Sequence, residues 1–403
     1  MKGLLRDFSL SAAVAGFIAT VISYAGPLVI IFQAADAAHL SREVLSSWVW
    51  AISIGSALLG IGLSLRYRVP VIIAWSAPGS ALLVALLPGI SMPEAVGAYL
   101  VSSLIIFLIG VSGAFDRIIS KLPAAIAAAM LAGILFSFGT GLFVSLQGKP
   151  WLVLAMFATY LMCKRLMPRY AVLMVLLVGC SMAMLAGDLR VDALVIGLAT
   201  PVWISPQFSL SATLNIALPL VMVALTGQFV PGMAVLRASG YSTPASPIIA
   251  SSALGTALLA PFGCHGLNLA AITAAICTGR EAHEDPGKRY VAGVVGGLCY
   301  LVLGIFGATL VSLFSAFPKE LIAALAGLAL FGAIAGALAG AMAVPNDREA
   351  ALVTFLATAS GMSLFGLSAA FWGLIFGILT HLLLNARRAA PGTKATPAPH
   401  TLR

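Results

Sequence analysis

Long apolar runs separated by short polar stretches follow one another along almost the whole chain. Runs of roughly 17–25 apolar residues are long enough to cross a lipid bilayer as helices. The pattern predicts an all-α polytopic membrane protein in which no stretch is left for a separate soluble domain. Fourteen transmembrane segments are predicted, at residues 10–34, 43–65, 70–88, 93–114, 121–146, 150–167, 171–187, 211–236, 244–258, 260–279, 289–315, 319–343, 348–364 and 369–386.

Two of these segments are interrupted by glycine, proline and polar residues. The third contains Trp75–Ser80, and the tenth contains Pro261–Asn268. Backbone that leaves helical pairing at membrane depth is tolerated only where protein or a watery cavity satisfies its N–H and C=O groups. Either break alone is also compatible with a kinked helix. Two matched breaks in corresponding positions of two halves are typical of a transporter binding site.

Each broken segment is expected to contain a half-helix that follows a short extended approach. Residues 71–74 and 257–260 are the apolar approaches, and the half-helices are predicted to begin at Pro78 and at Gly266. Proline suits the first helical turn, where its missing N–H costs nothing.

The breaks belong to an internal repeat of about half the chain. Segments 1 and 8 each place a polar residue three positions before a mid-span proline, as Tyr24 before Pro27 and Gln228 before Pro231. Seven segments make up each half. An odd number of crossings forces the second half to enter the membrane from the opposite side, so the two repeats are predicted to be inverted.

Composition and charge exclude several other classes of protein. With 61% hydrophobic and 9% charged residues and a mean hydropathy of +1.07, the chain lacks the roughly 25% charged residues of a soluble domain. Five scattered cysteines disfavour a disulfide framework or a zinc site, and no metal or cofactor is predicted. The interior also shows neither paired aspartates nor a histidine cluster, so an embedded enzyme is disfavoured.

The net charge of +9 does not indicate nucleic-acid binding, because the basic residues form short clusters between apolar segments. All but four of the 22 basic residues fall on the side of the membrane that holds the termini. Cytoplasmic loops carry an excess of Lys and Arg. Both termini are therefore predicted to be cytoplasmic. The four exceptions are Arg42, Lys149, Arg190 and Lys319.

The thirteen acidic residues all fall in loops or at segment ends. A transporter of cations would usually place a carboxylate in its cavity. Its absence favours an anionic substrate, which two opposed half-helix N-termini could attract through their unpaired N–H groups. The candidate substrate-binding residues are Tyr24, Ser76, Gly79, Ser80, Gln228, His265, Gly266 and Asn268.

Several of these residues have a structural as well as a functional interpretation. His265 could carry a proton, since histidine titrates near neutral pH, or it could be a satisfied internal group. Gln228 and Asn268 could donate to substrate oxygens or tie the broken backbone together. Four aromatic residues could stack on a ring or simply pack: Tyr24, Trp75, Phe229 and Phe262.

Glycines spaced by four residues occur in the last predicted segments. Such spacing puts small residues on one helix face and predicts close helix packing, which permits a homodimer without requiring one. The residues concerned are Gly332, Gly336, Gly340, Gly373 and Gly377.

Three stretches carry a resemblance to a known family. Trp75–Leu82, Gln228–Gly232 and Pro261–Asn268 resemble motifs of the benzoate/proton symporters, and the likeness covers residues 5–388. That family is distantly similar to uracil/xanthine permeases and sulfate-type anion transporters. The resemblance implies a 7+7 inverted repeat with short strands before the half-helices of segments 3 and 10. It also implies proton-coupled uptake of benzoate or a similar aromatic carboxylate across a bacterial inner membrane.

The resemblance further implies a core domain that shifts against a gate domain to give alternating access. The expected divisions are the first core half at 1–115, the first gate half at 116–187, an external connector at 188–210, the second core half at 211–315, the second gate half at 316–388 and a disordered cytoplasmic tail at 389–403.

One departure from the nucleobase permeases bears on the substrate. Those relatives typically carry acidic residues in segments 8 and 10, where this chain has Gln228 and Leu267-Asn268. An acidic group would repel a carboxylate, so its absence favours an aromatic acid. A passive anion channel or an inorganic-anion exchanger of the same fold remains the alternative function.

Overall fold

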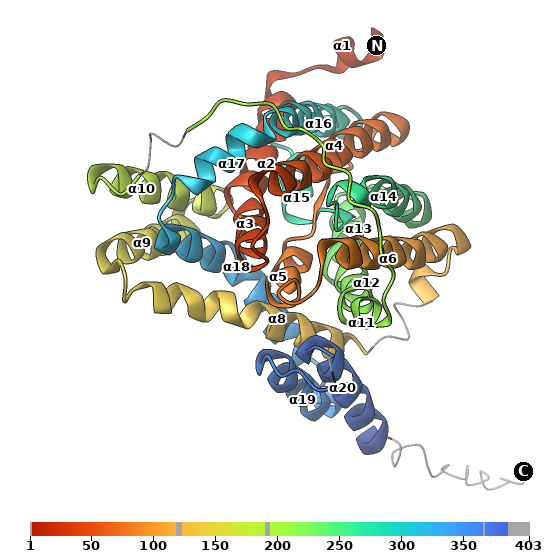
Figure 1. The fold of residues 1–403 in the computed structure, drawn as a ribbon. Helices are drawn as coiled ribbons and strands as arrows, with labels where there is room; N and C mark the ends of the chain where they lie inside the picture. The colour runs from red at the N-terminus through yellow and green to blue at the C-terminus, as the bar shows by residue number, and fades with distance from the viewer. Residues whose placement is uncertain (1, 118–122, 190–193, 366, 386–403) are drawn as a thin grey trace, which may run out of the picture.

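The computed structural model describes residues 2–117, 123–189, 194–365 and 367–385, and helices dominate it (Figure 1). Within these ranges, eight helices are long and apolar enough to cross a membrane by length and composition. The chain is therefore a mostly helical polytopic membrane protein. The other predicted segments hold shorter helices, so the count of fourteen crossings stays a prediction. The expected tail at 389–403 lies outside the described residues.

The first half of the chain contains the breaks of segments 1 and 3. Its elements are α1 (Lys2–Asp7), α2 (Leu10–Ala25), α3 (Pro27–Ala37), α4 (Arg42–Tyr67), β1 (Ile73–Trp75), α5 (Ala77–Leu86), α6 (Met92–Ser112), α8 (Ala124–Ser145), α9 (Pro150–Leu166), η1 (Pro168–Tyr170) and α10 (Ala171–Leu185).

The second half contains two π-helical turns, η3 and η4, and a second strand. Its elements are α11 (Leu210–Ala212), η3 (Thr213–Ala217), α12 (Leu218–Ala224), η4 (Leu225–Phe229), α13 (Val230–Ala238), α14 (Ala245–Leu259), η5 (Ala260–Phe262), β2 (Leu267–Leu269), α15 (Ile272–Thr278), η6 (Pro286–Lys288), α16 (Tyr290–Ile305), α17 (Gly307–Ser315), α18 (Lys319–Ala341), η7 (Pro345–Asp347), α19 (Arg348–Ala359) and α20 (Ala369–Asn385).

Local chemistry explains where several helices begin. The hydroxyls of Ser9, Ser41, Ser76 and Ser91 each accept a backbone N–H from the first turn of α2, α4, α5 and α6. Such N-caps satisfy donors that have no partner within the helix. These serines therefore set the starts of four helices, including the half-helix α5.

Prolines interrupt the two segments that the repeat relates. Pro27 starts α3 directly after the end of α2, because a proline has no N–H to donate to the preceding turn. In segment 8, Pro231 lies in the first turn of α13, immediately after the π-helical turn η4 that contains Gln228. Single π-turns within helices often occur at functional sites.

The two strands bring the breaks of segments 3 and 10 together. β1 and β2 are antiparallel, and Ala74 pairs with Asn268 at the centre of the register. Each strand is followed by a short helix, α5 after β1 and α15 after β2. Their backbone groups are thus satisfied by each other in the protein interior, as non-helical backbone at membrane depth requires.

The predicted start of the second half-helix at Gly266 is wrong. Residues 257–259 belong to α14, and α15 begins only at Ile272. The chain turns instead at Gly263, whose φ of +100° suits glycine. The following residues pair with β1 as strand β2 and only then become helical, so the extended approach lies at 267–269 rather than 257–260.

The long helices pack in two groups. In one, α8 lies along α18 and α19, α19 along α20, and α9 along α10; in the other, α4 and α2 pack on α16, and α6 packs on α14. Figure 1 shows α9, α10 and α18 on one side of the molecule, α4, α14 and α16 on the other, and α19 and α20 at the lower edge.

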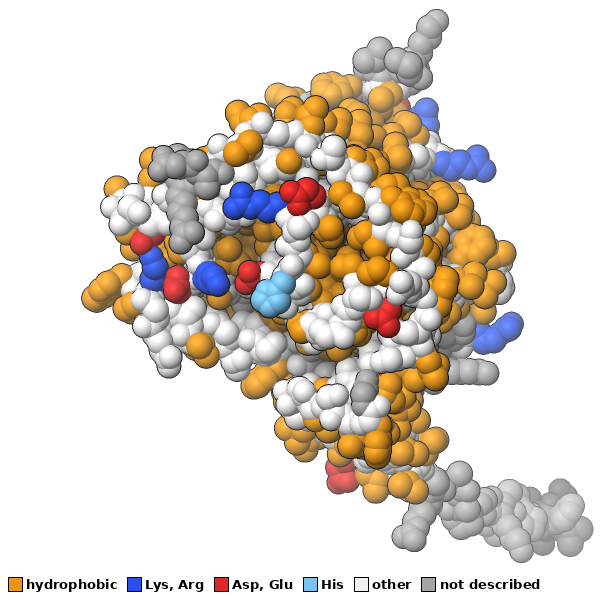
Figure 2. Space-filling model, viewed as in Figure 1, with side chains coloured by type: hydrophobic (Ala, Val, Ile, Leu, Met, Phe, Trp, Pro, Cys, Tyr) orange, Lys and Arg blue, Asp and Glu red, His pale blue; other side chains and the backbone are white. Residues whose placement is uncertain are grey.

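Residues 194–209 form an extended connector with no helix. It runs across one face between α10 and α11 (Figure 1). The amides of Val195 and Gly197 donate to the hydroxyls of Ser312 and Thr309 on α17, and the amide of Ile204 donates to Pro261. The connector is therefore fastened to α17 and η5, which both pack on α4 and so belong to the second group. On this face, charged side chains are few, and several of them lie next to a side chain of opposite charge (Figure 2).

The glycines spaced by four do not all serve close packing. A side chain at Gly373 or Gly377 would collide with Thr358 or Thr354, and a Cβ at Gly340 would lie 3.3 Å from Ala128. The expectation is wrong for Gly332 and Gly336, because a Cβ there would meet nothing within 4 Å. Spacing along a helix cannot tell whether a partner helix lies opposite.

Candidate functional site

A cavity of about 540 Å³ lies between the two helix groups. Its volume is within the roughly 300–1,000 Å³ of small-molecule sites. The proline breaks of segments 1 and 8, strand β1 and the starts of α5 and α15 border it on one side, and α8, α10 and α18 border it on the other. Most of the lining is apolar. The polar side chains on it are Ser23, Trp75, Thr226, Gln228 and Thr273.

Two buried polar groups on residues of the cavity lining have no hydrogen-bond partner among the described residues. They are the indole N–H of Trp75 and the hydroxyl of Thr273, whose side chains are 4% and 6% exposed. The hydroxyls of Thr226 and Ser23, by contrast, donate to carbonyls of their own helices. Leaving a buried polar group unpaired costs about 1–3 kcal/mol. Trp75 and Thr273 are therefore lining residues that each carry a buried, unpaired donor.

The two half-helices present different N-termini. At α5 the amide of Gly79 donates to the Ser76 hydroxyl at 2.9 Å, and the amide of Ser80 donates to the Ser76 carbonyl. Pro78 has no N–H. At α15 the residue before the helix is Ala271, which supplies no side-chain cap. The first-turn donors of α5 are thus largely satisfied within the protein, and the start of α15 is the less satisfied one.

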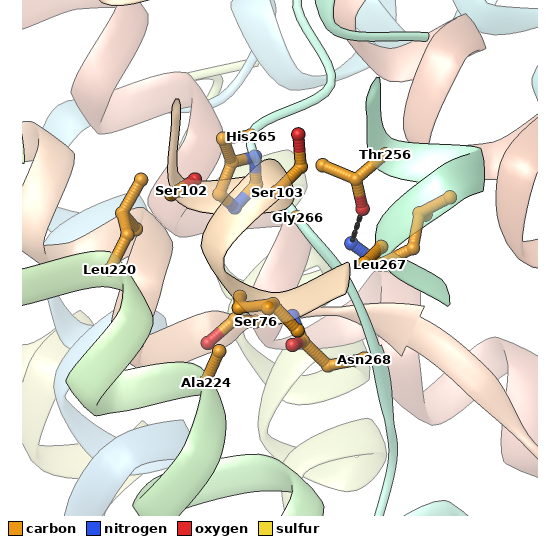
Figure 3. A pocket seen from close by; sticks show the side chains of 12 residues that line it. Ser76, Ser102, Ser103, Leu220, Ala224, Thr256, His265, Gly266, Leu267 and Asn268 are labelled. Carbon is orange, nitrogen blue, oxygen red and sulfur yellow. Dashed lines mark hydrogen bonds between the residues drawn. The ribbon is translucent and has the colours of Figure 1, made fainter. Parts of the chain in front are cut away.

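A second, much smaller cavity lies among α6, α12, α14 and strand β2, next to Ser76 at the start of α5 (Figure 3). Its volume of about 20 Å³ is about that of one water molecule. The predicted site residues Ser76, His265, Gly266 and Asn268 line this small cavity, whereas Gln228 lines the large one. Three others line neither cavity: Tyr24, Gly79 and Ser80.

His265 has a partner on each ring nitrogen. The Trp48 indole donates to Nδ1 at 3.1 Å, and Nε2 lies 3.0 Å from the Ser80 hydroxyl, which itself donates to the Ser76 carbonyl. Because Nδ1 accepts, the proton of the neutral ring is assigned to Nε2. His265 thereby joins α4 to the first turn of α5.

The predicted aromatic residues separate into two environments. Trp75 lines the large cavity, and its ring packs edge-on against Tyr24 at 5.2 Å and Tyr300 at 5.9 Å between centroids. Tyr24 lies behind it and donates to the hydroxyl of Ser53. Phe229 is fully buried, and Phe262 packs against Trp50 and Trp203. Of the four, Trp75 is the one placed to touch a ligand in the large cavity.

Comparison with known proteins identifies the chain's relatives. A family model described as the benzoate membrane transport protein matches residues 6–383. The chain belongs to this family. A protein of Acinetobacter baylyi named benzoate membrane transport protein is 50% identical over 390 residues, which cover 97% of this chain and 99% of that protein. The inner membrane protein YdcO of Escherichia coli is 42% identical over 383 residues, covering 94% and 98%. As a member of a family of transport proteins, this chain is not an enzyme.

Two proteins with solved structures of similar fold are described as an anion transporter and a bicarbonate transporter. The structure of SLC26A9 superposes with a TM-score of 0.61 at 13% identity, covering 95% of this chain and 67% of that one. The transmembrane domain of the cyanobacterial bicarbonate transporter BicA gives a TM-score of 0.55 at 14% identity, covering 94% and 97%. At such low identities the likeness concerns the fold alone.

In this member of the benzoate family, the sequence patterns did not indicate Thr273 as a site residue. They indicated Trp75 only as a ring that could stack on a ligand. Thr273 is the second residue of α15, so it lies where a helix N-terminus offers donors. Placing the half-helix start at Gly266 hid this position. The signal that could have indicated it is a threonine in the first turn of a helix that follows a strand and has no side-chain cap.

Proposed function

We propose that the protein imports benzoate or a similar aromatic carboxylate together with a proton across the bacterial inner membrane. The observation that carries the proposal is a large, mostly apolar cavity whose lining includes two residues with buried, unpartnered donors. A ligand that fits such a site has an apolar body and one small group of acceptors. The names of the relatives from Acinetobacter baylyi and Escherichia coli agree with this substrate and this membrane.

The carboxylate is held by the Trp75 indole, the Thr273 hydroxyl and the uncapped first turn of α15. The amide of Gln228, on the same lining, adds a donor. Charge-assisted hydrogen bonds to a carboxylate are about twice as strong as neutral ones, so no lysine or arginine is needed. The remaining predicted residues act behind the cavity, where they hold the two breaks in place: Tyr24, Ser76, Gly79, Ser80, Gly266 and Asn268.

His265 carries the coupled proton in this proposal. It lies within the break of segment 10 and contacts Ser80 in the first turn of α5, and its Nδ1 accepts a hydrogen bond from the Trp48 indole. Protonation at Nδ1 requires that indole to leave, because a protonated ring has no acceptor. Proton binding is thereby linked to a shift of α4 against α5.

Alternating access moves the core domain, segments 1–4 and 8–11, against the gate domain, segments 5–7 and 12–14. The two groups of packed helices support this division. Contacts between charged loops support the fourteen crossings and their sidedness. Asp7 pairs with Arg68, and Lys149 pairs with Asp188. Two predicted crossings separate the members of each pair, so both members are expected on the same side of the membrane.

Uptake of radiolabelled benzoate into proteoliposomes, with and without an inward proton gradient, tests the proposal. The expected result is accumulation that the gradient stimulates. Absent uptake rejects the transport of benzoate, and gradient-independent uptake rejects symport. Electrogenic current without proton flux favours the alternative of a passive anion channel or an inorganic-anion exchanger.

A further inference from the structure

The two sides of the large cavity differ in chemistry. Every polar side chain on its lining comes from segments 1, 3, 8 and 10, whereas every lining residue from α8, α10 and α18 is apolar. We propose that the small residues of α8 and α18 form a wall that selects substrates by the substituents on their ring. This small-residue wall consists of Ala124, Ala127, Ala128, Ala329, Ala333, Gly336 and Ala337. The inference rests on the proposed function and names the substrate class that the cavity accepts.

The buried donors set the direction of the substrate. Trp75 and Thr273 lie on β1 and α15, which contribute nothing to the small-residue wall, and each is more than nine-tenths buried with a free hydrogen. A carboxylate bound to these donors leaves the aromatic ring in the part of the cavity bordered by the wall. The position opposite the carboxylate, C4 of a benzoate ring, then points away from the donors.

The wall offers no hydrogen-bonding side chain to that end of the ring. A hydroxyl or amino group there would lose its water partners without replacement, which costs about 1–3 kcal/mol as judged from protein mutations. A methyl group loses nothing by contact with alanine side chains and is limited only by space. The small-residue wall therefore favours carboxylates with unsubstituted or apolar rings over hydroxylated ones.

Gly336 leaves room in this wall. A Cβ at Gly336 would meet no atom within 4 Å, because the cavity lies beside it. Gly332 lies one turn earlier on α18 and also has no neighbour within 4 Å, but it does not line the cavity. The same substitution at Gly332 and at Gly336 has the same effect on helix propensity. Only the substitution at Gly336 reduces the volume of the cavity.

The experiment compares uptake of benzoate, 4-methylbenzoate and 4-hydroxybenzoate by proteoliposomes containing the full chain, Gly336→Leu or Gly332→Leu. We expect the unmodified protein to prefer benzoate to 4-hydroxybenzoate by about tenfold or more in kcat/KM. Gly336→Leu should lower kcat/KM for 4-methylbenzoate by about a further tenfold relative to benzoate. Gly332→Leu should leave the kcat/KM values of the three substrates in the same ratios as in the unmodified protein.

A gain of function provides a second measurement that does not depend on the larger side chain. Ala333→Ser places a hydroxyl on the small-residue wall and should raise the ratio of 4-hydroxybenzoate to benzoate uptake several-fold. If Gly336→Leu does not elute as a folded protein, the uptake ratio of Ala333→Ser tests the proposal instead. Benzoate uptake with equal ratios in all folded variants overturns the selective wall and leaves the proposed function intact, whereas no benzoate uptake by the unmodified protein overturns both.

Discussion

Single donor groups distinguish the large cavity from an ordinary gap between helices. Thr273 and Thr226 both line it, yet the hydroxyl of Thr226 donates to the Met222 carbonyl at 2.7 Å and that of Thr273 has no partner among the described residues. Two threonines on the same lining thus differ in that one hydroxyl is paired and the other is unpaired. Only the unpaired one can improve its hydrogen bonding when a carboxylate arrives.

This contrast predicts the effect of Thr273→Val, which keeps the shape of the side chain and removes the hydroxyl. We expect kcat/KM for benzoate uptake to fall about tenfold or more, since a hydrogen bond to a charged group contributes about 1.5–3 kcal/mol. Thr226→Val is the matched control and should have a smaller effect. Equal losses in the two variants, measured in proteoliposomes at equal protein content, would contradict a role for Thr273 in binding.

His265 can be tested in a way that separates hydrogen bonding from titration. A glutamine at this position can accept from Trp48 and donate to Ser80 but does not bind a proton near neutral pH. We expect His265→Gln to remain folded, to exchange benzoate across the membrane and to lose stimulation by a proton gradient. His39→Gln, at an exposed loop position, should keep that stimulation. A purely structural His265 predicts instead that His265→Gln keeps it as well.

At the scale of elements, the turn at Gly263 decides where segment 10 becomes a strand. Gly263 has a φ of +100°, and a Cβ there would lie 3.0 Å from the Cβ of Trp48. Gly240 has a similar φ of +86°, but a Cβ there would meet nothing within 4 Å. A substitution at either glycine therefore strains the backbone in the same way. Only a substitution at Gly263 also brings the new side chain against a neighbour.

We expect Gly240→Ala to lower the free energy of unfolding by about 1–2 kcal/mol, the usual cost of a left-handed conformation for alanine. Gly263→Ala should cost more, because Trp48 must also move, and should disturb the hydrogen bond from Trp48 to His265. Thermal unfolding in detergent measures both variants. A Gly263→Ala midpoint equal to or above that of Gly240→Ala would show that the contact with Trp48 relaxes freely.

At the scale of the whole molecule, transport requires the two helix groups to move against each other. A Cβ on Gly26 would lie 2.9 Å from that of Ala329 on α18, across the two groups. A Cβ on Gly197 in the connector would lie 3.5 Å from that of Ala308 on α17, within one group. The second pair already has the roughly 3.5–4.5 Å separation of disulfide-bonded Cβ atoms, and a small backbone shift brings the first pair to it.

Cysteine pairs at these positions, in a background without the five native cysteines, test the motion. Oxidation of the pair at positions 26 and 329 should reduce benzoate uptake to background, and reduction should restore it. Oxidation of the pair at positions 197 and 308 should leave uptake unchanged. Full uptake by the cross-linked 26/329 protein would rule out movement of α18 against the break of segment 1.

The sequence alone determined the properties that depend on neighbouring residues. Hydropathy indicated a mostly helical polytopic membrane protein. Pro78 indicated the first turn of α5, and the acidic residues all fell in loops or at segment ends. Backbone preference and transfer into lipid act over one or two helical turns, so a local pattern suffices for them.

Only the tertiary structure decided which distant groups meet. Pairing of β2 with β1 moved the start of α15 from Gly266 to Ile272, and it left Thr273 on the large cavity and Asn268 on the small one. The partners of His265 come from α4 and α5, and the open space at Gly336 exists because the large cavity lies beside it. These outcomes depend on contacts between residues far apart in the chain, which no local pattern encodes.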